Sequence, residues 1–149
     1  MLNARNNIKI YFAGAIRGGR ENEVIYAQLI DFLGQFGEIL TCHIGEKNVN
    51  TSERQFSEQE IHARDFKWLS EADVIIAEVS TPSLGVGYEI GRAVEAGKPI
   101  LCLYSIHADF ELSALIEGCR ELNVIHYDHL TDTYPVIEKF LEELRTENH

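Results

Sequence analysis

The chain has 149 residues and a formal net charge of −11, with 45% hydrophobic and 25% charged residues. This length fits one domain with a full hydrophobic core, and the composition is that of a globular rather than a disordered chain. The strong negative charge disfavours non-specific binding to nucleic acid or to anionic membrane surfaces. No apolar run approaches the roughly 20 residues of a membrane-spanning helix, and the N-terminal segment has no apolar signal region, so we expect a cytosolic or nuclear protein.

In chain order, apolar runs typical of strands alternate with segments of helical periodicity. We expect residues 1–7 to form a flexible N-terminus. The first half then contains a strand at Ile8–Phe12, a helix at about Glu21–Gln35, a strand at Glu38–His43, a loop at Gly45–Arg54 and a helix at about Ser57–Glu71. Ser57 and Glu60 have the spacing of a capping box at the start of that helix.

The second half continues the same alternation. Its elements are a strand at Val74–Glu78, a helix at about Val86–Ala96, a strand at Ile100–Tyr104, a short helix within residues 111–118, a strand at Val124–Tyr127 and a helix at Tyr134–Arg145. Continuous apolar strands that alternate with helices indicate a parallel sheet covered on both faces. We therefore predict one α/β domain over residues 1–149, a doubly wound, Rossmann- or flavodoxin-like sheet of five parallel strands with helices on both faces.

The motif Ser83-Leu-Gly85-Val-Gly-Tyr-Glu89-Ile-Gly-Arg92 follows the strand predicted at Val74–Glu78. A glycine-rich turn that opens a helix binds anions, because its free backbone N–H groups and the helix dipole point at one spot. We expect Glu89 in the first turn of this helix, where the dipole would keep the carboxylate ionised and available as a nucleophile. The motif departs by one residue from the dinucleotide fingerprint and follows the third strand, which disfavours a nicotinamide or flavin cofactor.

A second loop, Gly14-Ala-Ile16-Arg17-Gly18-Gly-Arg20, follows the first predicted strand. Its glycines let the backbone curl, and its two arginines supply the local positive potential that a phosphate site needs in so acidic a chain. The carboxyl ends of parallel strands gather at one edge of a sheet, where ligands of doubly wound folds bind. His43, at the end of the second predicted strand, belongs to the same edge and either lines a pocket or simply ends the strand.

Asp65 lies on the apolar stripe of its predicted helix, between Ile61 and Leu69. Burial would raise the pKa of this carboxyl group and suit it to work as a general acid. The alternative is a buried aspartate that holds a loop by accepting hydrogen bonds from backbone amides. The histidines and cysteines show no metal-ligand spacing, so we expect neither a metal nor another cofactor.

Four segments together resemble the 2′-deoxynucleoside 5′-phosphate N-hydrolases of the nucleoside 2-deoxyribosyltransferase superfamily, namely Tyr11–Arg20, Ile61–Leu69, Ala72–Val79 and Pro82–Ala93. The resemblance extends from about Ile8 to the last predicted helix. It implies cleavage of the N-glycosidic bond of a deoxynucleoside monophosphate, which releases the free base and 2-deoxyribose 5-phosphate. It also implies a homodimer whose active sites borrow residues across the interface.

By position, the resemblance implies that Glu89 is the nucleophile, which attacks C1′ and forms a covalent glycosyl-enzyme. It implies that Asp65 donates a proton to the leaving base and that Tyr11 lies beside the nucleophile. The phosphate contacts that it implies are Ile16, Arg17, Ser83 and Gly85, with Ser113 reaching the phosphate in the neighbouring subunit. To these substrate contacts we add the residues that the sequence places at the same sheet edge, Gly14, Gly18 and His43.

Two other functions stay open. A nucleoside 2-deoxyribosyltransferase has the same nucleophile but passes the sugar to a second base, and Arg17, Ser83 and Ser113 favour a phosphate over its 5′-hydroxyl pocket. A non-catalytic nucleotide-binding module is the alternative from another class, although a phosphoreceiver is disfavoured because Phe12-Ala-Gly14 carries no acidic cluster. The sequence does not determine the base, but the polar segment Gly45–Arg54 lies where base selectivity would be set.

Overall fold

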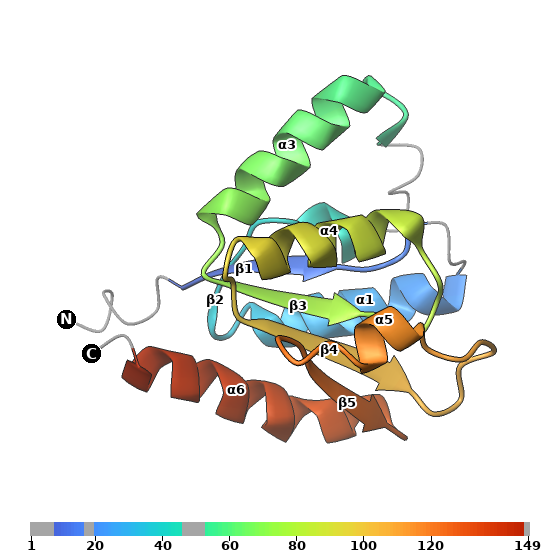
Figure 1. Cartoon of the computed structure of the whole chain (residues 1–149), viewed down its shortest axis with the longest axis vertical. Helices are drawn as coiled ribbons and strands as arrows, with labels where there is room; N and C mark the ends of the chain where they lie inside the picture. Colours follow the sequence, from blue (N-terminus) through green and yellow to red (C-terminus); the bar gives the residue numbers. More distant parts are fainter. Residues whose placement is uncertain (1–7, 17–19, 46–52, 148–149) are drawn as a thin grey trace.

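A sheet of five parallel strands in the order β2-β1-β3-β4-β5 forms the centre of the described chain (Figure 1). The computed structural model describes residues 8–16, 20–45 and 53–147. The strands are β1 (Ile8–Ala13), β2 (Gly37–Ile39), β3 (Val74–Glu78), β4 (Ile100–Ser105) and β5 (Asn123–Tyr127). The helices are α1 (Arg20–Leu33), α3 (Glu58–Glu71), α4 (Leu84–Glu95), α5 (Ala114–Glu117) and α6 (Thr133–Glu147), with short 3₁₀ helices η2 (Cys42–Gly45) and η3 (Leu130–Asp132).

Helices cover both faces of the sheet, because successive strand residues point to opposite sides. On one face, Leu29 of α1 and Ile137 of α6 pack against strand residues such as Ile76. On the other face, Leu69 of α3 and Ile90 of α4 belong to a second apolar core. Figure 1 shows α3 and α4 on one side of the sheet and α6 on the other. The predicted fold class, a doubly wound parallel α/β sheet, is therefore confirmed.

The strand order changes direction at the centre of the sheet, between β1 and β3. Ile10–Ala13 pair in parallel with Val74–Ala77, whereas β2 lies outside β1 and β4 lies outside β3. The helices that follow β1 and β3 therefore cover opposite faces of the sheet, and ligands of such folds bind at the carboxyl ends of the two strands. This is the edge at which the sequence places its candidate site residues.

The second strand is shorter than predicted, because a side chain replaces its backbone pairing. β2 ends at Ile39, and the amide of Leu40 makes one more hydrogen bond to the carbonyl of Ile10 at 2.9 Å. The hydroxyl of Thr41 then donates to the carbonyl of Phe12 at 2.6 Å and accepts from its amide at 2.9 Å. His43 accordingly lies in η2, and the predicted strand end at His43 is wrong.

The first turn of α4 also differs from the prediction. The helix begins at Leu84, two residues earlier than expected, because the Ser83 hydroxyl caps it by accepting from the amide of Val86 at 3.2 Å. Glu89 therefore lies in the second turn, not the first, and further from the positive end of the dipole. The capping box predicted for α3 is confirmed, with both Ser57–Glu60 hydrogen bonds at 3.1 Å.

Several predictions fall on residues outside the described part of the chain. These are the N-terminus at 1–7, most of the loop at 45–54, and the candidate phosphate contacts Arg17 and Gly18. Among the helices of the described residues, none has both the length and the apolar character that crossing a membrane requires.

Candidate active site

Three polar side chains from three elements meet on the face of the sheet that α3 and α4 cover. Tyr11 lies in β1 with 1% of its surface exposed, Asp65 lies in α3 and Glu89 lies in α4. Burial and the charges of Glu89 and Asp65 raise the pKa of the Tyr11 phenol far above its ordinary value. Tyr11 therefore stays neutral and acts as a hydrogen-bond donor beside the two carboxyl groups.

Glu89 is held by one oxygen, while the other has no partner among the described residues. Burial raises the pKa of Glu89 to about 7, the hydrogen bond from Tyr11 lowers it, and the charge of Asp65 raises it further. The Oε2 atom is buried and accepts no hydrogen bond from the described residues. The expectation that the helix dipole keeps Glu89 ionised is wrong in direction, because desolvation outweighs it at this depth.

Asp65 is partly buried and paired with its sequence neighbour. Its Oδ1 accepts from Nε of Arg64 at 2.9 Å. Burial raises the pKa of Asp65, and the Arg64 guanidinium opposes this shift. The raised pKa agrees in direction with the predicted general acid. None of the hydrogen bonds between Asp65 and the described residues involves a backbone amide, and the alternative role of holding a loop stays a prediction.

A charged and aromatic cluster surrounds Asp65, and most of it was not predicted from the sequence. Oε1 of the buried Glu53 lies 2.8 Å from Nη2 of Arg64 and 3.1 Å from Nε2 of His43. The Arg64 guanidinium stacks over Trp68 with 5.0 Å to the ring centroid. His43 thus lies in the cluster beside Asp65, and its contact with substrate stays a prediction. Arg64 adjoins Asp65 in the sequence, but no motif or periodicity predicts the ion pair between Arg64 and Glu53.

The N-terminus of α4 provides the anion-binding geometry that the motif predicted. Ser83 caps the helix, and the amides of Leu84 and Gly85 precede its first hydrogen bond, which Gly87 makes to the Ser83 carbonyl at 3.1 Å. Neither amide makes a hydrogen bond to the described residues. A Cβ at Gly85 would meet only the Ser83 hydroxyl, at 3.8 Å, so this end of the helix is open to a ligand.

The loop after β1 approaches the same edge of the sheet. Gly14 packs on the ring of Tyr26, where an added Cβ would lie 2.7 Å from the Cζ atom. The Tyr26 hydroxyl accepts from the amide of Ala15 at 2.9 Å. The glycine at position 14 is therefore required by packing, and its contact with substrate stays a prediction. Ile16 is the last described residue before Arg17.

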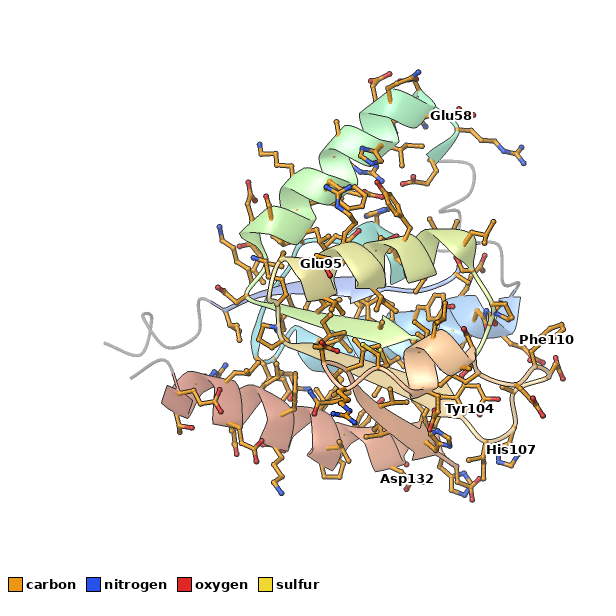
Figure 2. All side chains as sticks on the ribbon, viewed as in Figure 1. Glu58, Glu95, Tyr104, His107, Phe110 and Asp132 are labelled. Atoms are coloured by element: carbon orange, nitrogen blue, oxygen red, sulfur yellow. The ribbon has the colours of Figure 1, made fainter. Side chains whose placement is uncertain are left out.

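Ser113 lies across a groove from the capped end of α4. The groove has a volume of about 790 Å³ and runs between α4 and α5, with Ser83 and Ser113 both in its lining. Two leucines at its mouth, Leu84 and Leu115, expose 97% and 85% of their surface. The segment after β4 is fixed by Tyr104, whose hydroxyl donates to the carbonyl of Phe110 at 2.5 Å (Figure 2).

The groove does not include the two carboxyl groups, because it lies along a different face of α4. Val86 and Ile90 of α4 line it, whereas Glu89 points toward Tyr11 and Asp65. Within the described residues, no group of three or more His, Cys, Asp or Glu side chains is arranged to hold a metal ion. Two carboxyl groups beside a neutral tyrosine can do acid–base and nucleophilic work.

Comparison with known proteins agrees with the resemblance drawn from the sequence. The family model described as nucleoside 2-deoxyribosyltransferase matches residues 10–140. The chain is 47% identical over 138 residues to the 5-hydroxymethyl-dUMP N-hydrolase of Danio rerio, covering 91% of this chain and 94% of that protein. It is 46% identical over 114 residues to the Rattus norvegicus protein of the same name, covering 75% of this chain and 70% of that one.

A solved structure has the same fold. The CMP N-glycosidase of Clostridium botulinum aligns with a TM-score of 0.66, covering 89% of this chain and 98% of its own. At 22% sequence identity this likeness concerns the fold alone.

Proposed function

The chain belongs to the nucleoside 2-deoxyribosyltransferase family, and from that premise we propose that it hydrolyses 2′-deoxynucleoside 5′-monophosphates at the N-glycosidic bond. The products are a free nucleobase and 2-deoxyribose 5-phosphate. The observation that carries the proposal is the unpartnered Oε2 of Glu89, next to Tyr11 and Asp65 and one helical turn beyond a capped anion site. The names of relatives at 46–47% identity support the same reaction class.

In the first step Glu89 acts as the nucleophile. Its Oε2 forms a bond to C1′ as the C1′–N bond breaks, through a transition state with oxocarbenium character that the carboxylate stabilises. The bonding electron pair leaves with the base, which takes a proton from Asp65. Tyr11 stays neutral beside Glu89, where its hydroxyl stabilises the ionised carboxylate.

In the second step water attacks C1′ and releases Glu89. Asp65, now ionised, takes a proton from that water, so that the acid of the first step is the base of the second. Asp65 must change between its protonated and its ionised form in each cycle. Burial favours the protonated form, and the Arg64 guanidinium stabilises the ionised form.

The 5′-phosphate is bound at the capped end of α4. The amides of Leu84 and Gly85 and the hydroxyl of Ser83 face the anion, and the resemblance of the sequence adds Ile16 and Arg17, with Gly18 beside them, as further candidate contacts. Charge on the phosphate is stabilised by the helix dipole. Binding energy from this group, remote from the reacting bond, orients C1′ above Glu89.

The proposal includes a homodimer in which Ser113 contacts the phosphate bound to the neighbouring copy. The groove and the exposed side chains of Leu84 and Leu115 in its lining support this proposal. Contiguous apolar surface of this kind marks protein–protein interfaces. Free thiols at Cys102 and Cys119 suit a reducing compartment, so we place the enzyme in the cytosol or nucleus.

The test is a substrate panel with quantified release of base. dAMP, dGMP, dCMP, dTMP and 5-hydroxymethyl-dUMP are incubated with the protein beside the matching nucleosides and ribonucleotides. Release from deoxymonophosphates that Glu89→Gln abolishes is the expected result, and the panel gives the base preference at once. Base exchange between nucleosides, with no release from monophosphates, would make the chain a transferase. Nucleotide binding with neither reaction would make it a binding module.

A further inference from the structure

We infer that Glu78 is a positioning residue that holds the phosphate-binding loop between β3 and α4 in its working shape. The inference rests on the proposed function, because it concerns how the phosphate site is built. Glu78 touches neither the proposed nucleophile nor the proposed acid. It lies on the opposite face of the sheet from Tyr11, Asp65 and Glu89.

An acidic side chain is out of place at this position. Glu78 ends β3, whose other residues are Val74, Ile75, Ile76 and Ala77, all fully buried. Only 3% of Glu78 itself is exposed. A buried carboxyl group costs free energy unless donors satisfy it, so an apolar residue would make a more stable strand here. Local choices that work against stability concentrate at functional sites.

Among the described residues, the donors to Glu78 all come from the carboxyl edge of the sheet. The amide of Ser80 donates to Oε1 at 2.7 Å, and the hydroxyl of Ser80 donates to Oε2 at 3.0 Å. The hydroxyl of Tyr127, at the end of β5, also donates to Oε2 in a short hydrogen bond. One carboxyl group therefore clamps the loop: it binds both the amide and the hydroxyl of Ser80, the second residue of the loop, and links it to β5, which lies two positions away in the sheet.

The clamp extends to the neighbouring elements. The Ser80 hydroxyl, while donating to Glu78, accepts from the amide of Ser105 at the end of β4 at 2.8 Å. On the next loop residue, the hydroxyl of Thr81 accepts from Nδ2 of Asn22 in α1 at 2.8 Å. The segment from 80 to 83 is thus fixed to β4, β5 and α1 before it reaches the helix cap at Ser83.

The loop after β1 is held by a buried tyrosine of α1. The Tyr26 hydroxyl accepts from the amide of Ala15 at 2.9 Å. Gly14 packs directly on the Tyr26 ring. The position of this loop is therefore fixed by Tyr26, and that of the loop between β3 and α4 by Glu78. A shift of about 1 Å in either loop would misplace the donors of a phosphate site.

The experiment compares a monophosphate with its nucleoside in four proteins. These are the wild type, Glu78→Gln, Tyr127→Phe and the control Tyr134→Phe, which removes a hydroxyl from α6, where the ring stacks on Phe32 away from the loops. Glu78→Gln replaces an acceptor oxygen by an amide NH₂ that cannot receive the donors now shared between the two oxygens. Tyr127→Phe removes a single donor and tests the same cluster with less risk to folding.

For Glu78→Gln we expect KM for the monophosphate to rise about tenfold, the effect of one lost charge-assisted hydrogen bond, with kcat changed less than about threefold. The kcat/KM for the nucleoside should stay within about threefold, because the nucleoside makes no use of the phosphate loops. Tyr127→Phe should show the same split at smaller size, and Tyr134→Phe should behave as wild type. Equal losses for monophosphate and nucleoside, in variants that still melt cooperatively, would overturn the inference.

Hydrogen exchange separates this inference from the proposed function. In Glu78→Gln the amides of residues 79–87 should exchange faster, whereas those of α6 should not. That result is independent of turnover, so it supports the clamp even if the wild type releases no base and the proposed function fails. Unchanged exchange over residues 79–87 would rule out the clamp, whatever the protein catalyses.

Discussion

Glu89 is a carboxyl group whose burial is only partly compensated. The bond from Tyr11 stabilises the ionised form, but burial and the charge of Asp65 outweigh it and raise the pKa to about 7. Glu89 is a nucleophile only in its ionised form, and ionisation of this buried group lowers the stability of the folded protein. Such a conflict between local stability and chemistry is common at active sites.

Glu89→Gln should stabilise the protein at alkaline pH while abolishing turnover. Because the pKa rises from its ordinary 4.5 to about 7 on folding, stability falls as the pH rises through this interval and stays lowered above it. Removal of the charge should recover up to roughly 3 kcal/mol at pH 8 and almost nothing at pH 4. Thermal melts at the two pH values give the comparison, and an equal shift at both would contradict the desolvation argument.

Asp65→Asn should convert a bell-shaped pH profile into a single rising limb. The wild-type reaction needs Glu89 ionised and Asp65 protonated, so kcat/KM falls on both sides of its maximum. With asparagine only the ionisation of Glu89 remains, and activity should rise with pH to a plateau, with its midpoint at about 7 or lower because a neighbouring charge is gone. The rate should drop about 100-fold or more. A profile that still falls at alkaline pH would assign the acid to another group.

At the residue scale, the burial of Asp65 could be predicted from the sequence, but its neighbour cluster around Glu53 could not. The depth of Asp65 follows from its place between Ile61 and Leu69, and its raised pKa follows from that depth. The ion pair of Glu53 with Arg64 joins residues from different segments of the chain, and no periodicity or motif encodes such a contact. Glu78 left one readable signal, a single acid in an apolar buried strand.

At the scale of elements, the strands could be predicted because strands buried on both faces of a sheet have continuous apolar sequences. β1, β3, β4 and β5 lie within two residues of their predicted bounds. β2 was overextended because Thr41 pairs with Phe12 through its side chain, which a pattern of apolar residues cannot reveal. The start of α4 was misplaced because its cap is Ser83, and this moved Glu89 from the first turn to the second.

Ser83 caps α4 and is also a proposed phosphate contact, and two variants of Ser83 separate these roles. Ser83→Ala should lose about 1 kcal/mol of stability with the cap and raise KM for the monophosphate. Ser83→Asp keeps a good capping group but sets a negative charge against the phosphate, so stability should be retained while KM rises more steeply than in Ser83→Ala. If the aspartate variant binds the monophosphate as well as the wild type, the phosphate is not at this helix end.

At the scale of the whole molecule, the groove between α4 and α5 is the surface that the proposed dimer would cover. Gly87 and Gly91 line it one helical turn apart, and a Cβ at either would meet nothing within 4 Å. Small residues on one face of a helix permit close approach of another element, and the exposed leucines supply apolar surface beside them.

Leu115→Glu should turn the proposed dimer into a monomer that is still folded. Leu115 is 85% exposed in one copy, so the charge does not disturb the core of that copy, but it would be buried at the interface. Light scattering after size exclusion gives the mass, and circular dichroism checks the fold. Activity should fall with the loss of Ser113 from the neighbouring copy. A wild type that is monomeric at micromolar concentration would remove this part of the proposal.

The formal charge of −11 on each chain opposes the association of two copies. Two acidic molecules repel as they approach, and dissolved ions screen that repulsion within about 10 Å at 0.1 M. The same ions weaken the attraction between a phosphate and its donors. Ionic strength should therefore act in opposite directions on assembly and on substrate binding, and specific activity at low protein concentration should pass through a maximum as salt is added.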